Sequence, residues 1–568
     1  MKKWEIYPEN VQAIYKLCQD LNISSSLATI LSNRGVCNPV EAEKFLNPRL
    51  SNLNDPFDIP NIGFAAERVL RARESGEKVL VYGDYDVDGV TGTAILLQTL
   101  KFLGIDSSYY IPHRYGEGYS LSLASVKKIA ADGVKLIITV DCGIASAVEI
   151  EEANALEMEV IITDHHNLPH SLPKAFAIVN PKQMKSGHSS RNLSGAGVAF
   201  KFAWALLRTA GRKDNAFLTS LLDLASLGTI SDVVPLTGEN RILAAGGLKL
   251  INERKRFGLK YLADSASLFG KIMVNQIYFG LAPRLNAAGR LEHASKAVEL
   301  LLTENPDSAR DLADELNRIN SRRKDLGSGI KEDVFSKIEL VLEKESRILF
   351  LAGEDWHPGV IGIVASQVVD TYFRPTVLIG VKDGVGRGSA RSIEGLNIFE
   401  LLDSCRDLFL DFGGHEGAAG FEIVSDNILE LERRLKATAE EMIDPADLVP
   451  KIAIDAEIDP MQINLGLIDE IGKLQPFGEG NPDPVFMVRG LRLTDHKKVG
   501  NNKKHLKAWF SRDGVNLETI GFGMGKMADT LDYQKSYDIA FKLESNEYNG
   551  FASAQLSLVD VRETNLVS

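Results

Sequence analysis

Three aspartates at alternating positions follow an apolar run near residue 80. In the stretch VLVYGDYDVDGVTG, Asp84, Asp86 and Asp88 come directly after a segment that predicts a buried β-strand. If the strand continued through them, alternation would put all three side chains on one face. Charges of one sign held this close repel one another, and a divalent cation such as Mg²⁺ or Mn²⁺ would relieve that repulsion. The stretch therefore predicts one wall of a metal site.

Later segments end in residues of the same kind. The apolar runs that end in VDCG and TDHH supply Asp141, Asp164, His165 and His166. Asp232 interrupts another apolar stretch, SLGTISDVVPL. Ligands of an open parallel sheet bind at the carboxyl ends of its strands, so we expect these residues to converge. Two ions held roughly 3.5–4 Å apart by a shared carboxylate would clamp a phosphoryl oxygen and supply hydroxide. Any single aspartate has a plainer explanation as a helix cap, and Asp164 could cap the turn that follows it.

The segments around these residues alternate between strands and helices. Apolar strands are predicted at 77–86, 107–114, 134–143 and 158–166, with helical patterns at 89–104, 122–133 and 145–157 between them. This alternation predicts βαβ units and a parallel sheet covered on both faces.

The rest of the chain predicts further domains. Residues 195 to 345 are largely helical in pattern, and their mixed-charge end from 307 predicts a long solvated connecting helix. A second α/β unit begins near 346, and short strands from about 451 predict a small β-barrel or sandwich. Residues 1 to about 50 are mostly helical in pattern and lead into a linker rich in proline and asparagine. The fold class is therefore a multidomain α/β protein.

Composition limits the function classes. At 568 residues the chain is too long for one hydrophobic core, and its formal net charge of -13 argues against a protein that coats nucleic acid without specificity. Its four cysteines show no paired spacing, and the start lacks the apolar core of a signal peptide. We expect a cytoplasmic protein that does not enter a membrane.

The motifs, taken in order, resemble those of a known family. DYDVDG, VDCG, TDHH and SDVVPL are similar to the four ordered motifs of the DHH phosphoesterase superfamily. DWHPGVIGIVAS, GRGSARS and GGHEGAAG resemble the DHH-associated domain, and PFGEGNPDPVF resembles the opening of the OB-fold in the RecJ family of single-strand-specific DNA exonucleases. The resemblance covers roughly residues 50 to 560. It implies five parts: an N-terminal helical segment (1–50), a DHH catalytic domain (51–300), a connecting helix (301–345), a DHH-associated substrate-binding domain (346–445) and an OB-fold nucleic-acid-binding domain (446–568).

The resemblance also implies roles for the acidic and histidine residues. The implied metal ligands are Asp86, Asp88, Asp141, His165 and Asp232. Asp141 would bridge two ions, Mn²⁺ or Mg²⁺, while Asp84 would act in catalysis either as a ligand or from behind the ligands. His166 would face the phosphate. Inorganic pyrophosphatases of the superfamily carry a histidine ahead of the D-x-D, where this chain has Tyr82, which would loosen the coordination of the first metal.

Other candidates concern substrate recognition. The glycine-rich stretches GRGSARS and GGHEGAAG would place four polar residues on loops: Arg387, Ser389, Arg391 and His415. Glycines permit close approach to phosphate and arginine binds it bidentately, so by the resemblance these residues form a 5′-phosphate pocket. The alternative is a set of tight turns between strands. Arg114, Arg284 and Arg290 would line the path of the strand. His357 would either contact substrate or hold its loop.

The C-terminal barrel carries the densest positive run. Between Arg489 and Arg512 there are eight lysines or arginines, Lys503 and Lys504 among them, and one aspartate. Trp509 lies in the same run. Cations interleaved with aromatic rings suit single-stranded nucleic acid, on whose bases such rings stack. The alternative is a solvated hairpin with Trp509 in the core of the barrel.

The resemblance as a whole implies a metal-dependent 5′-to-3′ exonuclease that hydrolyses single-stranded DNA to 5′-mononucleotides in recombination and DNA repair. A helicase and a single-strand-binding protein would be its partners, and the chain would act as a monomer. Two alternatives stay open. One is a DHH phosphodiesterase of short RNA or cyclic dinucleotides, which the basic barrel argues against. The other is an inactive DHH-fold replication scaffold, which the intact motifs argue against.

Overall fold

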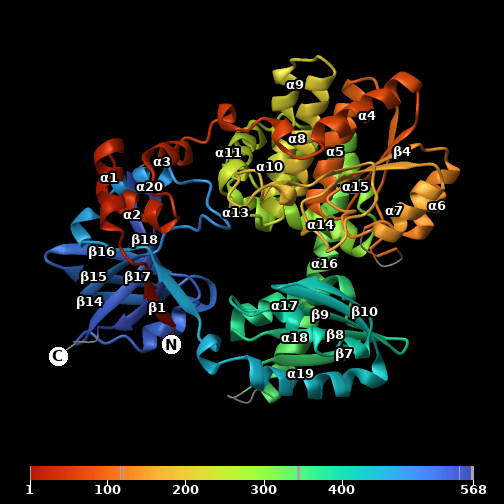
Figure 1. Ribbon diagram of the computed structural model, residues 1–568. Helices are drawn as coiled ribbons and strands as arrows, with labels where there is room; N and C mark the ends of the chain where they lie inside the picture. Colours follow the sequence, from red (N-terminus) through yellow and green to blue (C-terminus); the bar gives the residue numbers. More distant parts are fainter. Residues whose placement is uncertain (1, 115–116, 119, 342–345, 549–550, 565–568) are drawn as a thin grey trace. The chain divides into compact units, whose positions relative to one another are not determined.

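The computed structural model describes residues 2–114, 117–118, 120–341, 346–548 and 551–564 (Figure 1). The chain divides into two compact units. The smaller unit consists of Met1–Lys3, Arg290–Glu292 and Glu315–Ile452, and the larger unit of Trp4–Gly289, His293–Asp314 and Ala453–Ser568. None of the described helices combines the length and the apolar character that a membrane crossing requires.

A five-stranded parallel sheet in the larger unit carries the acidic strand ends. Its order is β3-β2-β4-β5-β6. The strands are β2 (Val79–Gly83), β3 (Ser107–Tyr110), β4 (Leu136–Val140), β5 (Glu159–Thr163) and β6 (Ala177–Val179). Both central strands β2 and β4 are buried along their whole length, as a sheet covered on two faces requires. The predicted parallel sheet is confirmed. However, β2 ends at Gly83, so the aspartates do not alternate along a strand.

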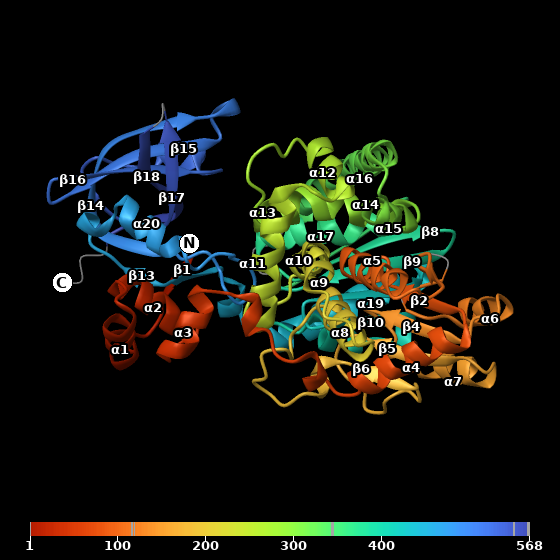
Figure 2. The ribbon, with the colours of Figure 1, turned by 90° about the horizontal axis from the view of Figure 1, so that it is seen from above.

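Helices cover both faces of this sheet (Figure 2). On one face pack α4 (Ile62–Ser75), α5 (Val87–Phe102) and α8 (Gly195–Thr209). On the other face pack α6 (Leu123–Ala131) and α7 (Ala147–Ala155), whose apolar residues share a core with Leu80 and Tyr82 of β2. The two layers fix the positions of the loops at the carboxyl edge.

Further helices complete this part of the chain. They are α9 (Asn215–Ser220), α10 (Leu222–Ser231), α11 (Gly238–Glu253), α12 (Phe257–Ser265), α13 (Val274–Gln276), α14 (Ala282–Leu291), α15 (Ser295–Leu302) and α16 (Pro306–Val341). With 36 residues, α16 is about 54 Å long, and the prediction of a long connecting helix is confirmed.

The smaller unit contains a mixed five-stranded sheet of order β10-β11-β9-β8-β7. Its strands are β7 (Leu349–Glu354), β8 (Thr376–Lys382), β9 (Val385–Arg391), β10 (Phe409–His415) and β11 (Ala418–Val424), and its helices are α17 (Pro358–Tyr372), α18 (Ile398–Asp403) and α19 (Ile428–Met442).

The prediction of loops was wrong for GRGSARS, which lies mostly on β9, whereas GGHEGAAG spans the end of β10, a tight turn at 416–417 and the start of β11, which is the turn alternative. Arg387, Ser389 and Arg391 lie on β9, which pairs with β8 on one side and β11 on the other. Its backbone amides are therefore used within the sheet. Gly388 pairs with Phe421, and a methyl group at Gly388 would lie 2.1 Å from Cζ of that ring. The glycine is there to make room for a neighbouring side chain.

The C-terminal segment forms a closed barrel of β14 (Phe486–Val499), β15 (His505–Arg512), β16 (Val515–Gly521), β17 (Ser536–Tyr548) and β18 (Phe551–Glu563). Closure comes from β14, which pairs with both β15 and β17. The predicted barrel is confirmed. Of the strands expected from residue 451, β13 (Ala456–Glu457) joins β14, whereas β12 (Lys451–Ile454) pairs with β1 (Lys3–Ile6) outside the barrel.

The N-terminal helices pack on this barrel. α1 (Val11–Leu21), α2 (Ser25–Asn33) and α3 (Pro39–Leu46) bury their apolar residues in one core with the barrel strands and with α20 (Leu465–Gly472). Leu17, Leu31 and Phe486 are members of this core. The first and last parts of the larger unit thus share one hydrophobic interior.

Candidate metal centre

The turn after β2 places the three aspartates differently from one another. Asp84 continues the sheet by one residue, since its N–H donates to the carbonyl oxygen of Val140 at 3.2 Å. Asp86 is the N-cap of α5, and its Oδ1 accepts the N–H groups of Asp88 (2.9 Å) and Gly89 (3.1 Å). Asp88 lies in the first turn of α5. The helix-cap alternative is thus true of Asp86, and the cap uses one of its two carboxylate oxygens.

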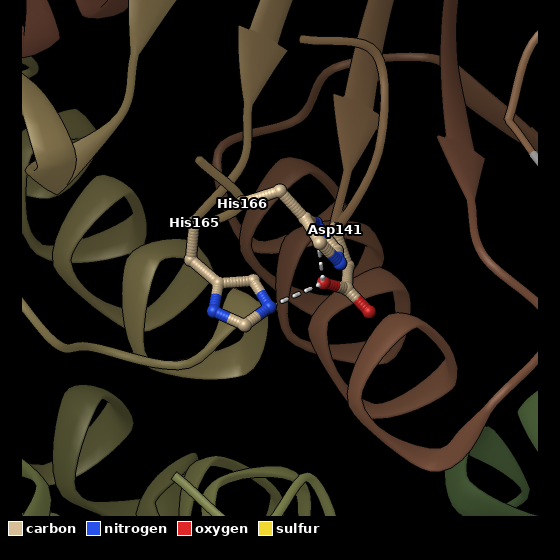
Figure 3. Close-up of side chains that lie close together, drawn as sticks. All are labelled: Asp141, His165 and His166. Carbon is tan, nitrogen blue, oxygen red and sulfur yellow. Dashed lines mark ion pairs between the residues drawn. The ribbon is translucent and has the colours of Figure 1, made fainter. Parts of the chain in front are cut away.

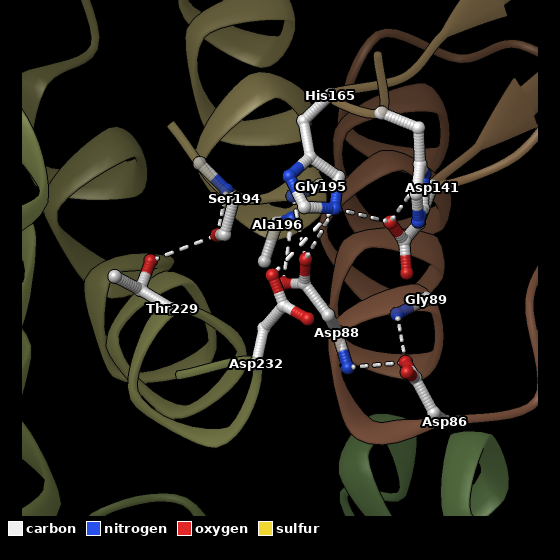
Figure 4. Close-up of polar contacts among 12 residues, drawn as sticks. Asp86, Asp88, Gly89, Asp141, His165, Ser194, Gly195, Ala196, Thr229 and Asp232 are labelled. Atoms are coloured by element: carbon white, nitrogen blue, oxygen red, sulfur yellow. Dashed lines mark hydrogen bonds and ion pairs between the residues drawn. The ribbon is translucent and has the colours of Figure 1, made fainter. Parts of the chain in front are cut away.

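The N-terminus of α8 holds Asp88. Oδ2 of Asp88 accepts the N–H of Gly195 at 2.5 Å, and Oδ1 accepts the N–H of Ala196 at 2.9 Å (Figure 4). The first N–H groups of a helix have no partner within the helix, so they favour a negative group at this position. Gly195 also packs against Asp141, and a methyl group there would lie 2.6 Å from Cβ of Asp141.

His165 lies at the centre of the carboxylates. Its Nε2 is 3.0 Å from Oδ1 of Asp141, 3.5 Å from Oδ2 of Asp232 and 3.9 Å from Oδ2 of Asp88 (Figures 3 and 4). Asp141 has a left-handed backbone with φ of 61°, and Asp232 directly follows α10. Three groups of side chains are close enough to hold an ion: Asp84 with Asp86 and Asp141, Asp88 with His165 and Asp232, and Asp141 with His165 and His166. Asp141 and His165 each belong to two of these groups.

Four of the carboxyl groups have raised pKa values. Burial, followed by the charge of Asp86, raises the pKa of Asp88 to about 7. Burial, followed by the charge of Asp88, raises the pKa of Asp232 to about 9. The pKa values of Asp84 and Asp141 also lie well above the ordinary range, because both are buried beside other carboxylates. Burial, assisted by the neighbouring His166, lowers the pKa of His165 to about 3, so this ring is neutral.

Asp164 orients the histidine pair. Its Oδ1 accepts the N–H groups of His165 (2.7 Å) and His166 (3.0 Å) and lies 2.8 Å from Nδ1 of His166. Its Oδ2 accepts the N–H of Ile144. These bonds fit the expectation that Asp164 caps the turn. Burial acts to lower the pKa of His166, but the hydrogen bond and charge of Asp164 outweigh it and the net pKa is raised.

Tyr82 lies on the other side of the sheet from the expected metal position. Its side chain is fully buried in the core beneath α6 and α7, and its hydroxyl donates to the carbonyl oxygen of Ser120 at 2.9 Å. It takes no part in the acidic cluster.

The cluster fits divalent ions. Oδ1 of Asp84 and Nε2 of His165 are buried and make no hydrogen bond with any residue that the structure describes. Carboxylate oxygens with one neutral imidazole form a donor set that suits Mg²⁺ or Mn²⁺. Positive ions at this position would also offset the repulsion that raises the four carboxyl pKa values.

Two helices that carry none of the predicted metal ligands complete the site. Besides α8, helix α14 supplies Asn286, whose Oδ1 accepts the N–H of Val87 at 3.2 Å. A methyl group at Gly289 of the same helix would lie 2.6 Å from the carbonyl oxygen of Tyr85. Ser194 is the N-cap of α8 in the sequence LSGAGVAF, and this capping pattern before an apolar helix was the one available signal.

The three arginines predicted to line the path of the strand have different surroundings. The guanidinium of Arg114 is 5.0 Å from the ring centre of Tyr85, beside the aspartate turn, and its charge acts on Asp84. Arg284 is 8% exposed and donates to the carbonyl oxygen of Gly280 at 2.6 Å. Arg290 belongs to the smaller unit and donates to the carbonyl oxygen of Gly359 at 3.3 Å. Of the three, Arg114 is brought to the acidic cluster.

In the smaller unit, polar residues gather at the first turns of α17. Nη1 of Arg391 donates to Oγ of Ser389 at 3.0 Å, and a methyl group at Gly362 of α17 would lie 2.7 Å from Nη2 of Arg391. His357 is the N-cap of α17, because its Nδ1 accepts the N–H of Gly359 at 3.1 Å, which is the loop-holding alternative for this residue.

The two other predicted residues of this unit have partners elsewhere on the sheet. Arg387 pairs with Glu422 of β11, with Nε and Oε1 2.8 Å apart. His415, at the end of β10, accepts the N–H of Gly417 through Nδ1 at 3.2 Å.

The barrel displays its tryptophan to solvent. Along β15 every second residue is buried; Phe510 lies in the core and Trp509 on the outer face. The ammonium groups of Lys497 and Lys507 each lie 5.3 Å from the ring centre of Trp509. The structure thus excludes the core alternative for Trp509. Lys503 and Lys504 are exposed in the connection between β14 and β15.

Comparison with known proteins identifies the family. Family models match in three places: the N-terminal domain of the DHH family over residues 78–229, the DHHA1 domain over 345–443 and the RecJ OB domain over 454–560. The chain is also 35% identical over 545 residues to the single-stranded-DNA-specific exonuclease RecJ of Haemophilus influenzae, covering 92% of this chain and 94% of that protein. The chain belongs to the RecJ family.

Other RecJ proteins match along nearly the whole chain. RecJ of Bacillus subtilis is 37% identical over 562 residues, covering 98% of this chain and 70% of that protein. The crystal structure of Thermus thermophilus RecJ in complex with Mn²⁺ matches with a TM-score of 0.86 at 31% identity, covering 99% of this chain and 80% of that one. The Mg²⁺ complex of the same RecJ matches with a TM-score of 0.80. The predicted RecJ fold class is confirmed.

Proposed function

We propose that this RecJ-family protein hydrolyses the phosphodiester bonds of single-stranded DNA from the 5′ end and releases 5′-mononucleotides, using two divalent ions, Mn²⁺ or Mg²⁺. The observation that carries the proposal is the convergence of three carboxyl groups, those of Asp88, Asp141 and Asp232, on one imidazole, His165. Relatives over nearly the whole chain are named single-stranded-DNA-specific exonucleases, and RecJ crystal structures of the same fold are complexes with Mn²⁺ and with Mg²⁺.

Five residues are proposed to hold the ions: Asp86, Asp88, Asp141, His165 and Asp232. Asp141 is suited to serve both positions because it belongs to two of the three ligand groups. Divalent ions in such a site lower the pKa of water and neutralise the charge of a phosphoryl group. Asp84 is assigned to the same centre, either as a further ligand beside Asp86 and Asp141 or from behind the ligands, where its buried carboxylate adds negative charge close to the ions. The N–H groups of Gly195 and Ala196 keep Asp88 in one orientation.

His166 is proposed to donate a proton or hydrogen bond to the scissile phosphate. Asp164 engages Nδ1, and we assign Nε2 to the contact with a phosphate oxygen. Because Asp164 raises the pKa of His166, the doubly protonated ring persists to higher pH than in an ordinary histidine. Arg114, whose guanidinium lies beside the Tyr85 ring, is proposed to bind a phosphate next to the scissile one.

Substrate binding is assigned to the remaining candidates. In the smaller unit we assign the 5′-phosphate to Arg387, Ser389, Arg391 and His415. Arg284 and Arg290 are assigned to the path of the strand, Arg284 from a largely buried position. On the barrel, Lys503, Lys504 and Trp509 are assigned to the single strand, since an outward ring between two lysines offers a base both stacking and charge.

The domain division and the cellular setting are also proposals. We retain the five parts 1–50, 51–300, 301–345, 346–445 and 446–568 as functional segments. The protein is proposed to act in recombination and DNA repair in the cytoplasm, as a monomer. A helicase would supply its single strand, and a single-strand-binding protein would keep that strand open.

Digestion of end-labelled DNA tests the activity. Single strands labelled at the 5′ or the 3′ end are incubated with wild type, Asp141→Asn and the control Asp132→Asn, an exposed aspartate at the end of α6. With Mn²⁺, the 5′ label is expected to appear at once in mononucleotides while the 3′-labelled strand shortens gradually, and a chelator should stop both. Asp141→Asn should lose more than the roughly 10–100-fold typical of a residue behind a ligand.

Release of the 3′ label first would overturn the polarity. Equal rates for wild type and Asp141→Asn would overturn the assigned site. Preference for RNA dinucleotides or cyclic dinucleotides over long DNA would make the protein a phosphodiesterase of short substrates. Full turnover by His166→Ala would remove that residue from the mechanism.

A further inference from the structure

The backbone directly after Asp232 is strained. Val233 has φ of 61°, and among the described residues it is the only β-branched residue with positive φ. The left-handed conformation is unfavourable for a β-branched side chain, and the side chain of Val233 is half exposed, so packing around that side chain does not enforce it. A strained residue persists when the surrounding structure over-determines it. The conformation of the Asp232 loop (232–237) must therefore be fixed by its neighbours.

Those neighbours come from the loop that leads into the barrel (473–481), here called the barrel-entry loop. The N–H of Leu236 donates to the carbonyl oxygen of Glu479 at 2.7 Å. Two glycines of the barrel-entry loop pack against the Asp232 loop. A methyl group at Gly478 would lie 2.7 Å from Cδ1 of Leu236, and one at Gly480 would lie 3.1 Å from Cβ of Pro235. The approach is so close that residues with side chains do not fit without displacement.

A buried arginine fixes the barrel-entry loop itself. Arg241 of α11 is 1% exposed, and its guanidinium donates to four backbone carbonyl oxygens. Its guanidinium donates to the carbonyls of Lys473, Gln475 and Pro476 in the barrel-entry loop. Nε donates to the carbonyl of Phe45 at the end of the N-terminal helices, at 2.8 Å. A buried charge is costly unless it is fully hydrogen-bonded, so Arg241 holds these carbonyls firmly in one arrangement.

We propose that the barrel-entry loop, clamped by Arg241, is a positioning element for Asp232 that ties the metal centre to the barrel. It holds the strained turn at Val233 and thereby directs the Asp232 carboxylate toward His165 (Figure 4). The proposal rests on the assignment of Asp232 as a metal ligand. It extends that assignment, because the PFGEGN stretch, 476–481, would support metal binding although it contains no metal ligand.

Direct titration of the protein with Mn²⁺ alone tests the proposal. Gly480→Ala is compared with Gly76→Ala, because both glycines have φ of 68° but nothing lies within 4 Å of the methyl group at Gly76. The two variants therefore carry the same backbone strain, and only one presses on the Asp232 loop. Gly480→Ala is expected to bind Mn²⁺ about tenfold more weakly, as for other residues that orient a metal ligand. Gly76→Ala should bind like wild type.

A rescue experiment separates positioning from general stability. Val233→Gly removes the cost of the left-handed turn, since glycine adopts positive φ freely. The orientation of Asp232 then depends less on the barrel-entry loop. The double variant Val233→Gly/Gly480→Ala should recover the Mn²⁺ affinity of wild type to within about threefold. Its melting temperature should still carry the strain introduced at residue 480. Recovery of affinity without recovery of stability is not expected from a purely structural contact.

Two results would overturn the proposal: unchanged Mn²⁺ affinity in Gly480→Ala, or a double variant as weak as the single one. If Gly480→Ala does not fold, Gly478→Ala is tested by the same criteria, because its methyl group meets the flexible end of Leu236. Wild type that binds no Mn²⁺ would instead refute the assigned metal site. These outcomes distinguish a failure of the positioning role of the barrel-entry loop from a failure of the metal-site assignment.

Discussion

At the scale of single residues, the crowded carboxyl groups set how stability changes with pH. An unfolded aspartate titrates near 3.9, whereas Asp88 and Asp232 in the folded chain titrate at about 7 and about 9. At a pH between the unfolded and the folded pKa values, the carboxyl groups of the unfolded state have lost their protons while those of the folded state still hold them. As far as these groups decide it, the free energy of unfolding of the metal-free protein should therefore be highest below about pH 4, where the carboxyls are protonated in both states. It should fall by about 1.4 kcal/mol per pH unit for each titrating carboxyl and level off above about pH 9.

Urea unfolding at pH 5.5 and 8.5, with a chelator or with Mg²⁺, measures this dependence. Mg²⁺ should flatten the fall, because the ion favours the ionised carboxylates. Asp232→Asn should also reduce the fall in the metal-free protein, whereas the exposed Asp132→Asn should leave it unchanged. Stability of the metal-free protein that rises toward pH 8.5 would contradict the prediction.

At the scale of elements, the first turn of α8 packs directly against the metal centre, although none of the predicted ligands lies on this helix. A methyl group at Gly195 would lie 2.6 Å from Cβ and 2.8 Å from Oδ1 of Asp141. Gly195→Ala is therefore expected to lower Mn²⁺ affinity by at least about tenfold. Gly197→Ala, two residues later, is the matched control. Its methyl group would meet Leu193 at 3.1 Å, and a leucine side chain can adjust.

Calorimetric titration with Mn²⁺ and a thermal melt of both variants check this expectation. Gly197→Ala should bind Mn²⁺ within about threefold of wild type and melt no lower, since alanine favours a helix over glycine by up to about 1 kcal/mol. If the two variants bound Mn²⁺ equally, the close approach of α8 to Asp141 would have no part in forming the site.

The sequence could predict the parts of the site that follow from local patterns, but not those that depend on distant segments. Asp84, Asp141 and His165 lie at ends of apolar strands, and the parallel sheet brings such ends together, so their convergence follows from local patterns. The donors to Asp88 come from 107 and 108 residues further along the chain, where no local period indicates them. The glycines of β9 suggested loops, yet Gly388 is a strand residue whose missing side chain leaves room for a phenylalanine on the neighbouring strand. A glycine in the sequence indicates that a side chain would not fit there, but it does not indicate which neighbouring group occupies the space.

At the scale of the whole larger unit, a buried ion pair joins the two ends of the chain. Nη1 of Arg34 in the N-terminal helical segment lies 2.7 Å from Oδ1 of Asp455, and both side chains are 4% exposed. The pair is bidentate, with a second contact of 3.3 Å. Asp455→Ala leaves the guanidinium buried without its carboxylate. The variant should lose about 3–5 kcal/mol of unfolding free energy.

Urea unfolding of the single and double variants measures the coupling. Arg34→Met/Asp455→Leu should recover at least about half of the loss, because it removes both charges and leaves apolar groups in a core. Losses that simply add in the double variant would show that the two residues stabilise the protein independently. The sequence does not predict this pairing, because residues 421 positions apart belong to no common periodic pattern.

The shared core of the N-terminal helices and the barrel also constrains how the protein is made. Residues 11–46 are synthesised long before the barrel strands, but the surface that buries Leu17, Leu31 and Phe45 belongs to a barrel that begins at residue 486. At about 5–20 residues per second, more than 400 residues of synthesis separate them by tens of seconds. During that time the helices expose an apolar stripe with no partner. The apolar residues of these helices therefore reach their final burial only after the barrel strands have been translated.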